Sequence, residues 1–419
     1  MLRKSRLLFA SVDALPQVGG VSLTGHHLAN ACVDAGAEVD FLVPSGDGHP
    51  PDFPARYAVL SDDGANPAAC HGAEWATVEL PRLISRIQRL HAKRQYHRMI
   101  AVHPAYYGQA FHRISEAAGP PSSIMFHGFE LRSQLMLRSH MQSVMWRLAG
   151  LKPTFRSEML AALKGADQIL VNSRYTGRLV RRGSGRDDLQ VIGCGMPLET
   201  FRDMRAREFE QHAACRHAAR RRLGLNPKDR IVGTLSRLVP QKNVELLIQS
   251  LARLPDIKAV IAGTGADEPR LKQKAATLGV ADRIIWPGFV SETQKWEWLR
   301  AIDAFCLLSR PGRSGEVEGF GIVLLEAATV GTPVIASNCG GMPDVVAHRR
   351  TGLLVDHSSV SQLCGAIEML TRENGPGPDY VAAAQMEIER RFNWCRIAEG
   401  LLRQWTNQGA LCDNLRIQV

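Results

Sequence analysis

Short apolar runs alternate with longer helical patterns along the whole 419-residue chain, and this alternation constrains the fold more than any other feature. The predicted strands lie near Leu7–Val12, Glu38–Val43, Met99–Val102, Ser123–Phe126, Gln168–Val171, Gln190–Ile192, Ile231–Thr234, Ala259–Ala262, Ile284–Trp286, Ala304–Leu308, Pro333–Ala336 and Leu353–Val355. The predicted helices lie at Gly25–Ala35, Val244–Arg253, Pro269–Leu278, Thr293–Ala301, Ile322–Val330 and Val360–Leu370. Such alternation is typical of parallel sheets covered by helices on both faces, so the predicted fold class is α/β.

A polar, arginine-rich stretch at residues 202–222 has no strand signal and interrupts this pattern. We therefore predict a boundary near Asn226, with an N-terminal domain over residues 1–225 and a second domain over residues 226–392. The final segment, residues 393–419, is expected to be helical and to return toward the N-terminal domain. Each domain is predicted to be a doubly wound, Rossmann-like sheet, in which ligands bind at the carboxyl ends of the strands. We expect the two domains to face a central cleft.

The net charge of +10 is uneven, because most of the surplus of Lys and Arg falls in residues 1–225. A basic half suits anionic partners, which include nucleic acid, anionic lipid head groups and phosphorylated substrates. A merely solvated surface is an equal alternative. The sequence has no zinc-finger, helix-turn-helix or aromatic RNA-binding signature, so nucleic acid is not an expected partner.

The nine Cys are scattered and form no C-x-x-C pair. This pattern argues against a zinc site or a disulfide framework and favours a reducing, cytoplasmic location. No apolar run approaches the roughly 18 residues that span a bilayer. The basic start of the chain is interpreted as a first strand and not as a secretory signal, because its apolar stretch ends at Asp13.

The stretch E-G-F-G-I-V-L-L-E, from Glu318 to Glu326, places two carboxylates around a glycine turn and the start of an apolar helix. A free helix N-terminus attracts phosphate, and glycines let an anion approach the backbone. A carboxylate can accept hydrogen bonds from both hydroxyls of a diol. The combination predicts a site for a nucleotide sugar, whereas the alternative is a helix-capping glutamate plus a solvated one. Glu316, just before the turn, is expected to be solvated.

Two further segments follow predicted strands of the second domain. Arg237 and Lys242 lie in a proline-containing loop, where two cations would hold a diphosphate; solvated loop cations are the alternative. Gly263–Gly265 is a G-x-G that lacks the third glycine and the acid of a dinucleotide-binding motif. This departure argues against the alternative of an NAD-dependent oxidoreductase.

Two features of the N-terminal domain also follow predicted strands. Gly19 and Gly20 form a turn that a ligand could approach closely, and a simple strand-to-helix turn is the alternative. His127 ends another strand and is a candidate contact to a substrate, although a lone histidine is more often structural.

These motifs together resemble the retaining GT-B glycosyltransferases of glycosyltransferase family 4, and the resemblance covers nearly the whole chain. Its most specific part is E-G-F-G-I-V-L-L-E-A-A-T-V-G-T-P-V-I-A-S, Glu318–Ser337, which is similar to the E-x7-E signature of the family. S-R-L-V-P-Q-K at residues 236–242 resembles the family's R-L-x-x-x-K segment. Residues 166–173 and 191–201 resemble the end of the family's acceptor domain. Three positions depart from the pattern: Asn243 replaces a common Gly, Asp344 a Glu and Pro197 an Asp.

The resemblance implies a role for each matched residue. The implied catalytic set is Glu318, His127, Arg237 and Lys242. The implied donor-binding set is Gly19, Gly20, Phe320, Gly321, Ile322, Glu326, Val290 and Lys295. Within these sets, Glu318 would contact the hydroxyls of the donor sugar and Glu326 the ribose. Val290 and Lys295 would lie near the nucleobase, and Asp13 would meet the acceptor.

The function implied by the resemblance is transfer of a hexosyl unit from a UDP- or GDP-sugar to a hydroxyl acceptor with retention. It would serve the synthesis of polysaccharide, glycolipid or another glycoconjugate. The alternative is a catalytically inactive nucleotide-sugar-binding protein. The sequence contains no D-x-D motif, so we expect no cofactor and no essential metal.

Residues 82–98 form a basic amphipathic pattern with Leu83, Ile84, Ile87 and Leu90 at helical spacing. Such a helix could lie on an anionic membrane and meet a lipid-linked acceptor. An ordinary surface helix is the alternative. The expected location is therefore cytoplasmic, with a peripheral position at the inner face of the plasma membrane as a second option.

Overall fold

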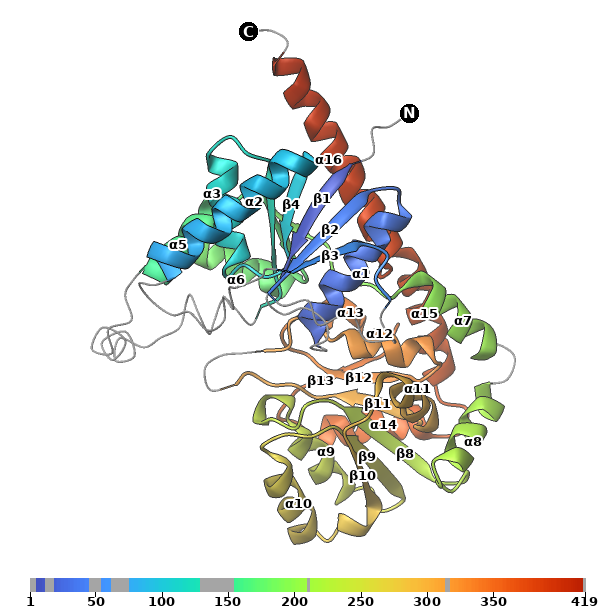
Figure 1. Ribbon diagram of the computed structural model, residues 1–419. Coiled ribbons are helices and arrows are strands. Elements are labelled where there is room, and N and C mark those ends of the chain that lie inside the picture. The colour runs from blue at the N-terminus through green and yellow to red at the C-terminus, as the bar shows by residue number, and fades with distance from the viewer. Residues whose placement is uncertain are drawn as a thin grey trace, which may run out of the picture. The chain divides into compact units, whose positions relative to one another are not determined.

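The computed structural model describes residues 5–11, 19–44, 54–61, 75–128, 154–208, 212–312 and 317–416. The chain divides into two compact units (Figure 1). Unit 1 contains Met1–Cys194 and Trp394–Val419, and unit 2 contains Gly195–Asn393. Each unit is built on one parallel sheet, so the predicted α/β class with two Rossmann-like domains is confirmed.

The sheet of unit 1 has seven strands in the order β3-β2-β1-β4-β5-β6-β7. Its strands are β1 (Arg6–Ala10), β2 (Glu38–Val43), β3 (Ala58–Ser61), β4 (Arg98–Ala101), β5 (Ser122–Phe126), β6 (Gln168–Val171) and β7 (Leu189–Val191). Its helices are α1 (Gly20–Asp34), α2 (Leu80–Arg94), α3 (Tyr107–Glu116), α5 (Thr154–Gly165), α6 (Arg174–Ser184) and α16 (Trp394–Arg416), with a π-helical turn at Trp75–Glu79. The edge strand β3 was not predicted, because its residues are exposed or half-buried and carry little apolar signal.

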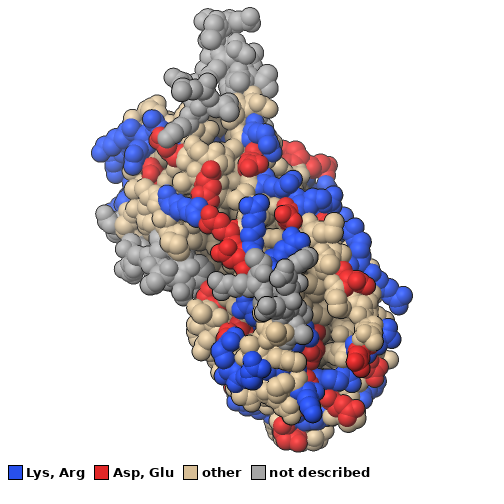
Figure 2. Space-filling view, turned by 90° about the vertical axis from the view of Figure 1, so that its right-hand side faces the viewer, with Lys and Arg blue, Asp and Glu red and all other residues tan. Residues whose placement is uncertain are grey.

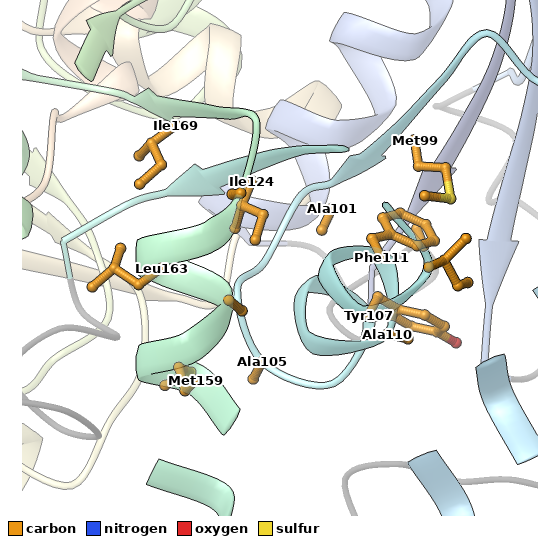
Figure 3. Close-up of a cluster of buried hydrophobic side chains, with 14 of the residues drawn as sticks. Met99, Ala101, Ala105, Tyr107, Ala110, Phe111, Ile124, Met159, Leu163 and Ile169 are labelled. Carbon is orange, nitrogen blue, oxygen red and sulfur yellow. The ribbon is translucent and has the colours of Figure 1, made fainter. Parts of the chain in front are cut away.

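One hydrophobic core cluster of unit 1 lies between the sheet and the layer of α2, α3 and α5 (Figure 3). Phe111 of α3 and Leu163 of α5 pack with Met99 of β4 and Ile124 of β5. The apolar residues of β4 and β5 are fully buried, as expected for central strands of a parallel sheet.

The basic helix α2 belongs to this core. Leu83 and Ile87 are buried in it, and Ile84 and Leu90 pack against it half-buried. The apolar face therefore contacts the protein's own core, which favours the ordinary surface helix over an inserted one. Among the residues that the structure describes, no helix is both long and apolar enough to cross a membrane.

The C-terminal helix α16 completes the other side of unit 1, where it packs beside α1 (Figure 1). Trp405 is buried, and its Nε1 donates to Oε1 of Gln168 at 2.7 Å. The guanidinium of Arg98 lies over the same indole ring at 5.4 Å from its centroid. These contacts tie α16 to the start of β4 and β6.

The sheet of unit 2 has six strands in the order β10-β9-β8-β11-β12-β13. Its strands are β8 (Arg230–Leu235), β9 (Ile257–Ala262), β10 (Ile284–Gly288), β11 (Ala304–Leu307), β12 (Val334–Ser337) and β13 (Leu353–Val355). Its α-helices are α7 (Leu198–Glu208), α8 (His212–Arg222), α9 (Val244–Leu251), α10 (Glu268–Thr277), α11 (Glu292–Ala301), α12 (Ile322–Thr329), α13 (Met342–Val345), α14 (Val360–Thr371) and α15 (Gly377–Arg390). Short 3-10 turns lie at Pro240–Lys242 and Ala281–Arg283.

The division between the units differs from the predicted boundary near Asn226, because the arginine-rich stretch belongs to unit 2. Arg220 of α8 is buried and donates to Oδ2 of Asp303 at 2.8 Å and to the Ala301 carbonyl at 2.8 Å. Asp303 also accepts from Arg216 of α8 at 3.1 Å. A buried ion-pair network therefore fixes α8 to unit 2, although its sequence looks like a solvated linker.

Many exposed charges on unit 2 have partners of opposite sign. Glu387 of α15 accepts from Arg350 at 3.2 Å and from Arg390 at 3.1 Å. On the face drawn in Figure 2, Lys and Arg side chains are interspersed with Asp and Glu. The uneven charge of the sequence therefore does not produce an unbroken basic surface on that face.

Candidate functional site

The loops that follow the strands of unit 2 gather at the carboxyl edge of its parallel sheet. The loop after β8 carries Arg237 and Lys242, and the segment before α12 carries Glu318. These three predicted residues are therefore brought to one edge by topology, although they lie far apart in the sequence.

Glu318 and Lys242 form an ion pair through Oε2 and Nζ, and Oγ of Ser309 also donates to Oε2 of Glu318 at 3.2 Å. The side chains of Lys242 and Glu318 are 20% and 18% exposed. Burial alone would raise the pKa of Glu318, but the charge and hydrogen bond of Lys242, the hydroxyl of Ser309 and the charge of Arg237 outweigh it. The pKa of Glu318 therefore lies below its usual value, and the carboxylate is ionised at neutral pH.

The turn before α12 requires a glycine. Gly321 has φ 91° and ψ 59°, and a Cβ there would lie 2.9 Å from Cδ2 of Leu307. Ile322 begins the helix, and Gly321 at its N-cap provides no side chain to bond the first N–H groups. The N-terminus of α12 is thus suited to an anion, with Glu318 close beside it.

Phe320, in the same turn, turns its side chain into the protein. Its ring is buried and meets the ring of Phe392 edge-on, with centroids 5.8 Å apart. Only the backbone of Phe320 is therefore suited to a donor, as the resemblance implied.

Glu326 lies farther along α12 and is buried. Its Oε1 accepts from Nζ of Lys295 at 2.6 Å, and the same ammonium group contacts Oε1 of Glu292 at 2.6 Å. Burial alone would lower the pKa of Lys295, but the two carboxylates raise it above its usual value. Sequence reasoning did not identify Glu292, although its position three residues before Lys295 on a helix was a usable signal.

Val290 is half-buried in the loop between β10 and α11. Its neighbour Phe289 is 77% exposed, which is unusual for a phenylalanine. Val290 thus lies just before α11, the helix that carries Glu292 and Lys295 in its first turns.

Asn243, where the family pattern has glycine, adopts the left-handed conformation with φ 52° and ψ 36°. Asparagine tolerates this conformation better than most residues. Its Nδ2 also donates to the carbonyls of Leu308 at 3.2 Å and His357 at 2.8 Å. The substitution therefore preserves the turn and adds two hydrogen bonds that fix the loop holding Lys242.

The G-x-G at Gly263–Gly265 supports this same loop. Gly263 has φ 121°, and a Cβ there would lie 1.9 Å from the carbonyl oxygen of Ser236. A Cβ on Gly265 would lie 2.2 Å from the carbonyl oxygen of Leu238. Close backbone packing accounts for both glycines, and the G-x-G therefore gives no support to an oxidoreductase.

The remaining predicted residues lie in unit 1. Gly19 is the N-cap of α1, and a Cβ on Gly20 would meet no protein atom within 4 Å. His127 follows β5, is buried, and donates from Nε2 to the Val102 carbonyl at 2.8 Å. Asn172 donates to the His127 carbonyl at 3.1 Å. Asp13 and Glu316 lie outside the described residues.

Two family models match the chain. "Glycosyltransferase Family 4" matches residues 18–200, and "Glycosyl transferases group 1" matches residues 216–385. A GDP-mannose-dependent alpha-(1-6)-phosphatidylinositol monomannoside mannosyltransferase of Mycobacterium tuberculosis is 30% identical over 64% of this chain and 68% of its own length. A D-inositol 3-phosphate glycosyltransferase of Mycobacteroides abscessus is 34% identical over 57% of this chain and 52% of its own length.

Solved structures share the fold over nearly the whole chain at low sequence identity. Sucrose-phosphate synthase from Thermosynechococcus elongatus has a TM-score of 0.75 at 22% identity, over 97% of this chain and 100% of its own. Anabaena HepE, solved with UDP and glucose, has a TM-score of 0.71 at 19% identity, over 96% of this chain and 100% of its own. The predicted GT-B fold is confirmed. The chain is a glycosyltransferase, and it belongs to glycosyltransferase family 4.

Proposed function

We propose that the protein transfers a hexosyl unit from a nucleoside diphosphate sugar to a hydroxyl acceptor with retention of configuration. The observation that carries this proposal is a pair of lysine–glutamate contacts: Lys242–Glu318 just before α12, and Lys295–Glu326 farther along the same helix. The pairs provide a carboxylate for each of two diols, and Lys242 together with Arg237 provides cations for a diphosphate, which are the polar groups of a nucleotide sugar.

The leaving group is a nucleoside diphosphate. Cleavage of the bond between the anomeric carbon and the phosphate oxygen leaves the electron pair on that oxygen. Arg237, Lys242 and the N-terminus of α12 would stabilise this charge. The acceptor hydroxyl would form the new bond on the face that the leaving group vacates, and its proton would pass to the departing diphosphate. No step needs a metal, and the expectation of no essential metal remains a prediction.

For the nucleotide we propose a GDP-sugar in preference to a UDP-sugar. The neighbouring Lys295 and Glu292 offer a hydrogen-bond donor beside a carboxylate acceptor. The carboxylate could accept from both N1–H and N2–H of guanine while the ammonium group donates to O6, whereas uracil offers the carboxylate a single N–H. The name of the M. tuberculosis relative, which specifies GDP-mannose, supports the same choice.

We propose that the acceptor is an anionic or lipid-linked hydroxyl compound in glycolipid or other glycoconjugate synthesis. The relatives are named for phosphatidylinositol monomannoside and for D-inositol 3-phosphate. Arg89 and Lys93 lie exposed on the outer side of α2, so contact with an anionic membrane would be electrostatic and not insertional. A cytoplasmic location, peripheral at the membrane, is part of this proposal.

The test begins with thermal shift in the presence of GDP, UDP and their hexose conjugates. Stabilisation by GDP compounds at lower concentration than by UDP compounds is expected, and no stabilisation by any of them would refute the donor proposal. Turnover should then be measured with Glu318→Ala and with Lys272→Ala as an exposed control. Binding without turnover would favour the inactive binding protein, and an inverted anomeric product would refute retention.

A further inference from the structure

The chain passes between the two units twice, after Cys194 and after Asn393. On the unit 2 side, the two passages are joined to each other. Met196 and Asn393 form a parallel bridge, and the Met196 N–H donates to the Phe392 carbonyl at 2.8 Å. All three residues are buried. We call the two bridged segments, Met196 and Phe392–Asn393, the crossing pair.

The crossing pair contacts the glycine turn directly. The ring of Phe392 meets that of Phe320 edge-on, at a centroid distance of 5.8 Å and an interplanar angle of 75°. Phe320 lies between Gly319 and Gly321, at the start of α12. A shift of this turn therefore changes the packing of the Phe392 ring. The backbone carbonyl of Phe392 accepts the hydrogen bond from Met196, which lies just after the first passage.

The contact is reinforced at the far end of α12. Gln385 of α15 is buried, and its Nε2 donates to the carbonyl of Ala328, near the end of α12, at 3.0 Å. The same helix α15 ends just before Phe392, and Nδ2 of Asn393 donates back to its Glu389 carbonyl at 2.7 Å. Helix α12 is thus attached at both ends to the segment that carries the crossing pair.

We propose that Phe392 is a positioning residue that couples occupation of the donor site to the two passages between the units. The inference rests on the proposed function, in which a donor binds the backbone of the glycine turn. Hinges consist of a few residues that absorb backbone change, and packed contacts between rings have discrete arrangements. A donor that orders Phe320 would order Phe392 and, through its carbonyl, Met196.

The experiment is amide hydrogen exchange followed by mass spectrometry, with and without saturating GDP or UDP. In the unaltered protein, nucleotide should slow exchange at residues 321–324 and also at Met196. In Phe392→Leu, protection at 321–324 should remain, while the protection of Met196 by nucleotide should fall by at least about threefold. Phe305→Leu, which alters a fully buried ring of β11 in the same unit, is the control for general destabilisation.

The outcomes separate the two proposals. Nucleotide binding without any added protection at Met196 would overturn the coupling and leave the proposed function intact. An equal loss at Met196 in Phe392→Leu and Phe305→Leu would also overturn it, because the effect would then be general. Failure of the unaltered protein to bind either nucleotide would overturn the proposed function and this inference together.

A double-mutant comparison adds an independent readout. If the ring contact transmits the effect, Phe320→Leu alone should reduce the protection of Met196 as much as Phe392→Leu does. The double variant should then be no worse than either single variant. Additive losses would mean that the two rings act separately and would contradict the coupling.

Discussion

Replacing Lys242 by Met tests the electrostatic account of the site most directly. The variant keeps a side chain of similar length but leaves the carboxylate of Glu318, 18% exposed, without its cation. Breaking a buried pair costs roughly 3–5 kcal/mol. Here partial exposure, the Ser309 hydroxyl and the charge of Arg237 remain, so we expect a loss of about 1–3 kcal/mol at pH 7.

The loss should depend on pH, with a sign that follows from the pKa of Glu318. In the unaltered protein this pKa is lowered, so the stability from the pair is present above the ordinary glutamate pKa and disappears as pH falls through the lowered value. In Lys242→Met the charge and the hydrogen bond of Lys242 are lost, so the pKa of Glu318 is higher than in the unaltered protein. The carboxyl group then takes up a proton as pH falls, and the deficit relative to the unaltered protein becomes smaller.

Calorimetry at pH 7 and pH 5 measures this effect. The Tm of Lys242→Met should be lower by about 2–12 °C at pH 7, from roughly 2–4 °C per kcal/mol for a domain of this size. The difference should be smaller at pH 5. Lys272→Met removes an exposed lysine, half of whose side chain is accessible, and should change Tm little at either pH. A deficit that is equal or larger at pH 5 would refute the reasoning.

Three further changes test other parts of the site. Lys295→Met removes the contacts of the ammonium group with Glu292 and Glu326. We expect the Kd for GDP, measured by titration calorimetry, to rise about tenfold, and an unchanged Kd would exclude Lys295 from the donor site. Gly321→Ala places a Cβ against Leu307 at positive φ, and it should lower the free energy of unfolding in urea by about 1–3 kcal/mol. Gly20→Ala has open space around the new Cβ, so it should change the free energy of unfolding by less than about 0.5 kcal/mol but weaken diphosphate binding. Asn243→Ala should destabilise the protein more than Asn243→Gly, because alanine loses the hydrogen bonds and keeps the strain; the reverse order in Tm would contradict this account.

The strands were predictable where burial on both faces of the sheet produces a short, nearly continuous apolar run. The strands at Glu38–Val43, Gln168–Val171 and Leu353–Val355 have the predicted bounds, because their residues are mostly or wholly buried. The edge strand Ala58–Ser61 was not predicted, because half-exposed residues carry little apolar signal. The division of the chain was placed too late for a different reason: the arginines of α8 are paired inside unit 2, and residue composition does not reveal such pairing.

The residues of the candidate site were predicted from their motifs, but their contacts were not. Glu318 and Lys242 are separated by 76 residues, and Glu326 and Lys295 by 31. Only the topology of the sheet brings each pair together, so no local spacing could have predicted the ion pairs. The roles of these residues in binding and catalysis remain predictions that the variants above address.

The position of α16 has a consequence for the order of folding. Residues of unit 1 that precede Cys194 are synthesised first, but α16, which packs beside α1 on one side of their sheet, is synthesised after unit 2. Unit 2 is continuous, so all of its strands and helices leave the ribosome before Trp405 can reach Gln168. Until then unit 1 lacks α16, and the side of its sheet that carries α1 is only partly covered, while unit 2 has its complete sequence. A nascent chain arrested before Trp394 should accordingly present a protease-resistant unit 2 and a protease-sensitive unit 1.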